Sequence, residues 1–268
     1  MANPYAKRYP NCQIDPRAQI APDVEIGSFS VIGGDVIIGQ GTQIGAHVVI
    51  DEGARIGMHC RIFPGAVISV SPQDLKFAGE VTTTEIGNHV TIREYATIHR
   101  GTSHRGTTVV NDHSLIMAYV HVAHDCIVGR NVIISNGSNL AGHAVVDDHA
   151  VIGGMVAVHQ FSQIGKHAMV AGASAIRKDI PPYVLTGRSP LSYVGVNHRG
   201  LSRRGFSQEI IRHIQEIYRV VFLSGLNVTQ ALRAVESQFP PSTEREDILN
   251  FIRGSERGII RSYSFSQG

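Results

Sequence analysis

An apolar residue recurs at every sixth position along most of this chain. Counting in sixes from Ile14 to Ile176 gives 28 positions, of which 25 are Ile, Val or Leu. The exceptions are Asp74, Glu80 and His104. A helix repeats its apolar face every 3.6 residues and a strand every second residue, so neither alone produces this spacing. The pattern predicts short strands that alternate with tight corners.

A second regularity accompanies the first. The residue four places after the apolar position is small or Val in nearly every hexad, as at Ala18, Val24 and Ser30. Glycine often follows the apolar residue directly, as at Gly27 and Gly39. We expect the apolar residue to point inward, the small residue to lie near the corner, and glycine to supply the backbone angles of the turn.

This repeat resembles that of the hexapeptide-repeat transferases, which fold as a left-handed parallel β-helix. Three hexads make one triangular coil in that family, so each residue stacks on the one three hexads away at one strand spacing, about 4.8 Å. The resemblance implies an all-β fold of this kind, with about nine triangular coils for the 28 positions. Such a narrow interior agrees with an aromatic content of 6% and the lack of Trp.

The repeat is interrupted twice and then ends. Residues 71–81 and 100–108 break the apolar rule and are predicted to be loops that leave the column, and loops on a rigid scaffold often carry function. After Pro182 the apolar residues adopt helical spacing. Helices are expected over residues 207–223, 228–238 and 243–253. We therefore predict a β-helix domain over residues 1–190 and a small α-helical domain over residues 191–268.

Composition and charge exclude several classes of protein. Charged residues make up 17% and hydrophobic residues 43% of the chain, which excludes a disordered protein. A formal net charge of +2 is too small for a protein that coats DNA, so no nucleic-acid partner is expected. No apolar run approaches the ~18 residues of a membrane span, and the N-terminus lacks the pattern of a signal peptide.

The cysteines indicate a reducing compartment. Cys12, Cys60 and Cys126 are too few and too scattered for a disulfide framework. No pair of them has the spacing of a structural zinc site. We expect a cytoplasmic protein that uses no metal or other cofactor.

The 14 histidines offer the candidate chemistry, because an imidazole can take up a hydroxyl proton near neutral pH. His121, His124 and His159 stand outside the register of the other corner histidines. Six histidines stand three places after an apolar position and are interpreted as solvated corners, namely His47, His59, His89, His113, His149 and His167.

A winding of three hexads per coil collects several polar residues in one patch. It stacks Gly142 on His124, and then Gln160 on Gly142. A histidine beside a glycine suits acyl transfer, because a backbone N–H can hold the oxyanion of a tetrahedral intermediate. A stack of hydrogen-bonded histidines and a metal site with His ligands are the alternatives. The patch contains His121, His124, Gly142, His143, His159 and Gln160.

An ordered set of motifs carries a closer resemblance. The motifs are SPQDLKFAGE, IREYATIHRGT, HVAHDC, LAGH, IGGMVAVHQF and the runs GVN and RRGFS. Together they are similar to the acyl-carrier-protein–UDP-N-acetylglucosamine O-acyltransferases, cytoplasmic enzymes that begin lipid A synthesis. The resemblance covers nearly the whole chain, the helical tail included.

The resemblance implies a reaction and a catalytic pair. An (R)-3-hydroxyacyl group would move from acyl carrier protein to the 3-position of UDP-N-acetylglucosamine, by direct attack and without an acyl-enzyme. His124 would be the general base, and the N–H of Gly142 the oxyanion donor. Asp125 would orient His124, although adjacent strand residues usually point to opposite faces. Asp74 and Lys76 would reach the substrate from a neighbouring subunit, because members of this family are homotrimers.

The resemblance also assigns the substrate pocket. Gly172 matches the position that limits acyl length, and its missing side chain predicts a chain of about fourteen carbons or more. Arg199 departs from the family, in which this position is acidic, so uridine recognition is expected to differ. Residues 186–206 contain four Arg and no acidic residue, which suits a diphosphate or the acidic carrier protein. The remaining implied residues are His121, His143, His159 and Gln160 along the pocket, and Asn197, Arg203 and Arg204 at the nucleotide.

Other functions are compatible with parts of the pattern. One is a hexapeptide-repeat zinc enzyme of the carbonic anhydrase type, with His ligands shared between subunits. Others are the N-acyltransferase that acts later in the same pathway and a non-catalytic β-helix scaffold. The SPQDLK loop, the helical tail and the RRG run favour the O-acyltransferase, while the residues leave open whether the acceptor is a hydroxyl or an amine.

Overall fold

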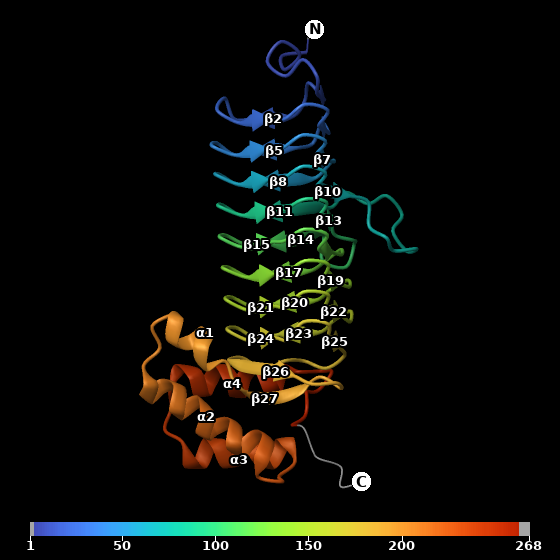
Figure 1. The fold of residues 1–268 in the computed structure, drawn as a ribbon. Coiled ribbons are helices and arrows are strands. Elements are labelled where there is room, and N and C mark those ends of the chain that lie inside the picture. Colours follow the sequence, from blue (N-terminus) through green and yellow to red (C-terminus); the bar gives the residue numbers. More distant parts are fainter. Residues whose placement is uncertain (1–2, 263–268) are drawn as a thin grey trace.

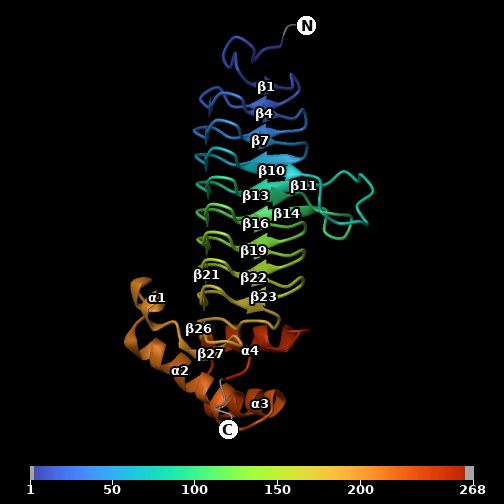
Figure 2. The same cartoon turned by 45° about the vertical axis from the view of Figure 1, so that its right-hand side comes forward.

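The computed structural model describes residues 3–262 of the chain. Figures 1 and 2 show a three-sided column of short strands, with one loop projecting from its side and four helices at one end. In each sheet of the column, neighbouring strands are one coil apart, so that Gln13 pairs with Val31 and Val31 with Val49. Residues three hexads apart therefore stack, and the fold is the left-handed parallel β-helix expected from the repeat.

The three sheets of the column follow one another around each coil. The first sheet contains β1 (Gln13–Ile14), β4 (Val31–Ile32), β7 (Val49–Ile50), β10 (Val67–Val70), β13 (Thr97–His99), β16 (His121–Val122), β19 (Asn139–Leu140), β22 (Ala157–Val158) and β25 (Ala175–Ile176). The second sheet contains β2 (Gln19–Ile20), β5 (Ile37–Ile38), β8 (Ala54–Ile56), β11 (Thr83–Ile86), β14 (Thr107–Val110), β17 (Ile127–Val128), β20 (Val145–Val146) and β23 (Gln163–Ile164). The third sheet contains β3 (Glu25–Ile26), β6 (Gln43–Ile44), β9 (Arg61–Ile62), β12 (Thr91–Ile92), β15 (Leu115–Ile116), β18 (Ile133–Ile134), β21 (Val151–Ile152), β24 (Met169–Val170), β26 (Val184–Gly187) and β27 (Ser192–Val196).

The apolar residue of each hexad fills the interior of the column. Ile68, Ile98 and Ile116 have no exposed surface, which is typical of the series. The residue three places later turns the corner with a positive φ, as at His47 (58°) and His113 (60°). All six predicted histidines have a positive φ at corners, and His59, His89 and His113 stack in a row. Four of the six are exposed as predicted, but His149 and His167 are half-buried, so the expectation of a solvated corner is wrong for these two.

The glycines that follow the apolar residues have a different role from the one expected. Neither Gly27 nor Gly39 has a positive φ. A Cβ on Gly27 would lie 2.4 Å from the amide nitrogen of Ala46, and one on Gly39 would lie 2.7 Å from the backbone of Gly57. The expectation from turn angles is therefore wrong. Glycine is needed there because successive coils approach each other too closely for any side chain.

The two interruptions of the repeat behave differently. The first links β10 to β11 and projects from the column (Figures 1 and 2), with Leu75 and Val81 almost fully exposed. The second links β13 to β14 and folds back onto the column, where Thr102 is only 6% exposed. Strand β14 begins at Thr107, so the last two residues of the second predicted loop belong to a strand.

The C-terminal part closes the column. β26 and β27 form an antiparallel hairpin that extends the third sheet, and the predicted domain boundary after Pro190 falls in its turn. The hydroxyl of the fully buried Tyr218 donates to the carbonyl of Pro182 at 2.6 Å, which ties the helices to the column. The helices are α1 (His198–Arg203), which was not predicted, α2 (Gln208–Leu223), α3 (Val228–Gln238) and α4 (Thr243–Gly254).

Residues 1–2 and 263–268, which the two predicted domains include, lie outside the described residues. Among the described helices, none has the length and apolar content needed to cross a bilayer.

Candidate active site

The candidate site is built on the corner between the first and second sheets. His124 and Asp125 follow β16 at this corner, and Asp125 has a φ of 59°. This left-handed conformation replaces the alternation of a strand, so the two neighbouring side chains turn toward each other. Nδ1 of His124 lies 2.8 Å from a carboxylate oxygen of Asp125. The contact expected between them is therefore present, for a reason that only the corner geometry supplies.

Asp125 is a buried carboxylate with several donors. Its side chain has no exposed surface. The hydroxyl of Thr102 donates to it at 2.6 Å, the N–H of Thr102 at 3.1 Å and the N–H of Arg105 at 3.2 Å. Burial by itself raises the pKa of Asp125, but the bonds from Thr102 and His124 outweigh burial and lower the pKa. The carboxylate is therefore ionised at neutral pH, and Nδ1 of His124 carries the proton that it donates to this group.

Gly142 lies against the imidazole of His124, one coil away. A Cβ on Gly142 would lie 2.6 Å from both Cε1 and Nε2 of His124, so only glycine leaves room for the ring. Within residues 3–262, the N–H of Gly142 donates no hydrogen bond. Gly142 thus keeps the space beside Cε1 and Nε2 of the imidazole open, on the side away from the Nδ1 that contacts Asp125.

A cleft of about 430 Å³ over the first sheet joins most of the predicted patch. His121, His124, Gly142 and Gln160 all line this cleft. Sequence reasoning missed three further lining residues whose side chains can donate or accept hydrogen bonds, namely Gln73, His99 and Asn139.

His99 was missed because the coil is longer than three hexads at this point. Thr97 pairs with His121 and not with Leu115, since the second loop adds one hexad to the coil. The ring of His99 meets that of His121 edge to face at 4.8 Å. Burial, and then the neighbouring His121, lower the pKa of His99 to about 4. Burial likewise lowers the pKa of His121, whose Nδ1 contacts the hydroxyl of Thr97 at 2.7 Å. Both rings are therefore neutral near pH 7.

His143 lies on the other side of the same corner. Its ring packs edge to face on His124 at 5.0 Å and stacks on Phe161 at 4.3 Å. Its Nδ1 is 3.8 Å from Asp125. Burial lowers the pKa of His143, and the charge of Asp125 opposes this shift. His143 lines a neighbouring cleft of about 810 Å³ together with His104 and Arg105.

Other predicted residues lie apart from this cleft within one chain. Asp74 and Lys76 are on the projecting loop, and the exposed His159 directs Nδ1 to the carbonyl of Gln160. Gly172 lies at the opposite edge of the first sheet, where a Cβ would meet the carbonyl of Gly154 at 3.0 Å.

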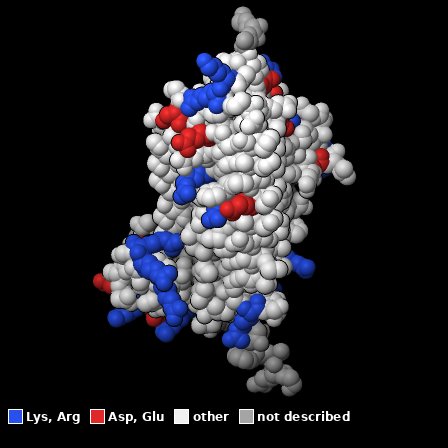
Figure 3. Space-filling model, turned by 45° about the horizontal axis from the view of Figure 1, so that its top comes forward, with Lys and Arg blue, Asp and Glu red and all other residues white. Residues whose placement is uncertain are grey.

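The predicted nucleotide residues lie at the corner between the second and third sheets. Asn197 is 8% exposed and caps α1, accepting from Gly200 and donating to the carbonyl of His167. Arg204 donates to the carbonyl of His149 at 2.8 Å, and Arg203 is exposed. Figure 3 shows basic side chains gathered on the side of the molecule that carries the C-terminal helices.

The corner at His124 could also supply metal ligands. One ligand atom each from His124, Asp125 and His143 lie within 4.8 Å of one another. Two ligands of one tetrahedral zinc ion are separated by about 3.3 Å. The 2.8 Å contact between His124 and Asp125 is instead a direct hydrogen bond, which favours the acid–base interpretation over a shared ion.

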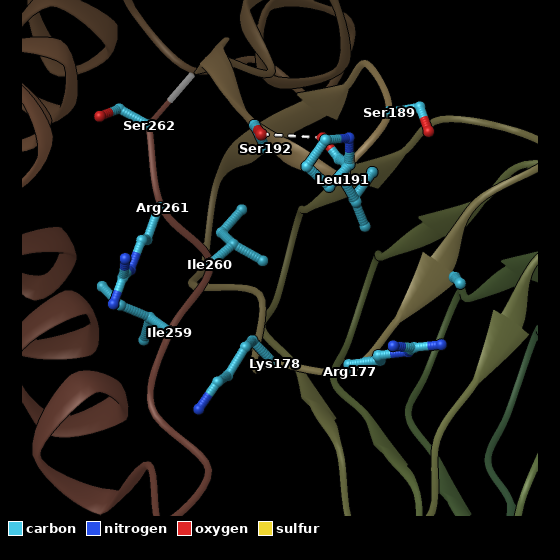
Figure 4. A pocket seen from close by; sticks show the side chains of 11 residues that line it. Arg177, Lys178, Ser189, Leu191, Ser192, Ile259, Ile260, Arg261 and Ser262 are labelled. Carbon is cyan, nitrogen blue, oxygen red and sulfur yellow. Dashed lines mark hydrogen bonds between the residues drawn. The ribbon is translucent and has the colours of Figure 1, made fainter. Parts of the chain in front are cut away.

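A separate cavity of about 710 Å³ lies where the C-terminal segment meets the hairpin (Figure 4). Arg177, Lys178 and Arg261 are the ionisable side chains that line it. None of its lining residues also lines the cleft at His124, so this cavity is distinct from the candidate site.

Comparisons with known proteins identify the family. Residues 179–260 match the family described as UDP-N-acetylglucosamine O-acyltransferase, domain 2, and residues 35–69 and 107–142 match the bacterial transferase hexapeptide family. The chain is 51% identical to the acyl-carrier-protein–UDP-N-acetylglucosamine O-acyltransferase of Trichlorobacter lovleyi over 73% of this chain and 77% of the relative. The corresponding enzyme of Aquifex aeolicus is also 51% identical, over 74% of this chain and 76% of its own.

Solved structures agree with this result. The UDP-N-acetylglucosamine acyltransferase of Bacteroides fragilis has a TM-score of 0.92 and 48% identity, covering 94% of this chain and 99% of its own. The corresponding protein of Acinetobacter baumannii has a TM-score of 0.90 and 42% identity, covering 94% and 98%. The chain is therefore an acyltransferase that belongs to the acyl-carrier-protein–UDP-N-acetylglucosamine O-acyltransferase family.

Proposed function

We propose that this chain transfers an (R)-3-hydroxyacyl group from acyl carrier protein to the 3-hydroxyl of UDP-N-acetylglucosamine, in the cytoplasm, as the first step of lipid A synthesis. The names of its relatives support this pair of substrates. The observation that carries the mechanism is that His124 contacts a buried carboxylate through Nδ1 and packs against Gly142 through Cε1 and Nε2, while the N–H of Gly142 donates no hydrogen bond within residues 3–262.

His124 acts as the general base. Its Nδ1–H is held by Asp125, so Nε2 keeps a free lone pair for the proton of the sugar 3-hydroxyl. As that proton moves to Nε2, the hydroxyl oxygen attacks the carbonyl carbon of the thioester. The imidazolium that forms is stabilised by the buried charge of Asp125, because a charge pair gains strength where water is excluded.

Gly142 holds the charge that develops on the substrate. The carbonyl oxygen becomes an oxyanion in the tetrahedral intermediate, and the N–H of Gly142 donates to it. The intermediate then collapses, the carbon–sulfur bond breaks, and the proton on Nε2 passes to the departing thiolate. The products are the 3-O-acyl sugar nucleotide and the free thiol of the carrier protein, with no covalent enzyme intermediate.

The remaining predicted residues bind the substrates. We place His121, His143, His159 and Gln160 along the reacting groups, and Gly172 at the far end of the acyl chain. Asn197, Arg203 and Arg204 hold the nucleotide, with Asn197 also fixing the start of α1.

The active enzyme is proposed to be a homotrimer with its sites between subunits. The cleft at His124 and the loop of Asp74 and Lys76 lie at the corner between the first and second sheets, whereas the arginines near α1 lie at the corner between the second and third sheets. A single chain cannot gather these groups around one substrate. A neighbouring column can supply the missing ones, and the nearly fully exposed Leu75 on the projecting loop is suited to such a contact.

The test is a product analysis with a matched pair of variants. The protein is incubated with UDP-N-acetylglucosamine and a panel of 3-hydroxyacyl carrier proteins, and the product is identified by mass and by the alkali lability of an ester. His124→Ala should lower turnover by about 10²–10⁴-fold. His113→Ala, at an exposed corner of the column, should keep normal turnover. Near-normal activity of His124→Ala, or an amide product, would contradict the proposal.

A further inference from the structure

The carboxylate that holds His124 is itself held by a segment of the chain that interrupts the repeat. Asp125 has no exposed surface, and three of the four hydrogen-bond contacts of its carboxylate come from residues 102–105. Two of these come from Thr102 alone, one from its hydroxyl at 2.6 Å and one from its N–H at 3.1 Å. Thr102 itself is 6% exposed, so water does not compete for these bonds.

The segment has a compact shape that keeps Thr102 in place. The N–H of Gly106 donates to the carbonyl of Thr102 at 2.7 Å, and Gly106 closes the turn with a φ of 81°. The N–H of Ser103 donates to Glu80, at the end of the projecting loop. Thr102 is thus fixed by its own turn and by a second loop before it contacts Asp125.

The hydroxyl of Thr102 decides where the carboxylate points. A carboxylate on a corner residue can rotate about χ2, which is a soft torsion. The hydroxyl bonds to the same oxygen, Oδ2, that contacts Nδ1 of His124, while the two backbone N–H groups bond to Oδ1. The hydroxyl therefore holds Oδ2, the carboxylate oxygen that faces the imidazole. The two backbone donors do not bond to Oδ2.

We propose that Thr102 is a positioning residue for the general base, acting on His124 through Asp125. The inference rests on the proposed role of His124, and it assigns a function in the reaction to the second interruption of the repeat.

The test compares three substitutions of buried threonines. Thr102→Val keeps the shape and the N–H but removes the hydroxyl, and should lower kcat about tenfold with KM unchanged, the effect of one hydrogen bond to a charged group. Thr102→Ser restores the hydroxyl and should restore kcat. Thr84→Val is the matched control, because the Thr84 hydroxyl is buried in β11 without a hydrogen-bond partner among the described residues. It should keep normal kcat.

A fourth measurement separates positioning from general destabilisation. If Thr102 acts through His124, then Thr102→Val should cause no further loss of kcat in the His124→Ala background. A tenfold loss in both backgrounds would overturn the inference, as would a kcat of Thr102→Val within twofold of the parent enzyme. If His124→Ala retained full activity, the proposed function would fail first, and the two failures are thus distinguishable.

Discussion

Replacing Gly142 by Ala tests the proposed site at its tightest contact. The new methyl group would lie 2.6 Å from Cε1 and Nε2 of His124 and 3.2 Å from its Nδ1. Gly142 has no positive φ, so alanine strains the ring contact and not the backbone. The substitution also keeps the N–H that is proposed to hold the oxyanion. Any loss of activity therefore reports on the position of the imidazole.

The size of the effect follows from the geometry. An ordinary contact of a Cβ begins at 3.4 Å, so the ring must retreat by about 0.8 Å. A retreat of this size disturbs the 2.8 Å hydrogen bond to Asp125 and displaces Nε2 from the substrate hydroxyl. Misplacement of a reacting group by about 1 Å costs about 10²-fold in rate. We expect Gly142→Ala to lower kcat by about that factor, with a smaller change in KM.

The assay is steady-state kinetics with UDP-N-acetylglucosamine and a long-chain 3-hydroxyacyl carrier protein. Gly254→Ala serves as the control, because no atom lies within 4 Å of a Cβ at that position. Thermal unfolding of both variants shows whether the column is intact. If Gly142→Ala kept kcat within threefold of the parent enzyme while remaining folded, the ring would not need its observed position, and the proposed geometry would be refuted.

Three further predictions concern other parts of the molecule. The parent enzyme should prefer acyl chains of about fourteen carbons or more, and Gly172→Met should shift the product masses to shorter chains; a parent preference for ten carbons or fewer would contradict the open groove. A chelator should leave activity unchanged, because His124 and Asp125 share a direct hydrogen bond; activity that is lost and then restored by zinc would favour a metal enzyme. Burial and the neighbouring Asp148 raise the pKa of Asp147 to about 6, so its charged form destabilises the fold above that pH. Asp147→Asn should therefore raise Tm at pH 8 and lose this advantage by pH 4, and an equal effect at both values would disprove the assignment.

Part of the candidate site followed from simple counting. The winding of three hexads per coil correctly placed Gly142 beside His124, because no residue is inserted between β16 and β19. It also placed Gln160 in the same cleft. The same counting missed His99, since the second loop lengthens that coil by one hexad and Thr97 meets His121. Thr102 was missed for the same reason, because an inserted segment has no register from which its position can be calculated.

The sequence by itself determined the fold. Each hexad predicts one strand and one corner, and the apolar residue recurs at 25 of 28 positions, so a few exceptions do not obscure the pattern. The column could therefore be predicted without knowledge of long-range contacts. The tertiary structure decided how the side chains at the corners are used. The left-handed conformation of Asp125 turns its carboxylate toward His124, and the loop after β13 returns to bury that carboxylate beneath Thr102. These contacts depend on backbone angles and on the path of an inserted loop, which the spacing of apolar residues does not encode.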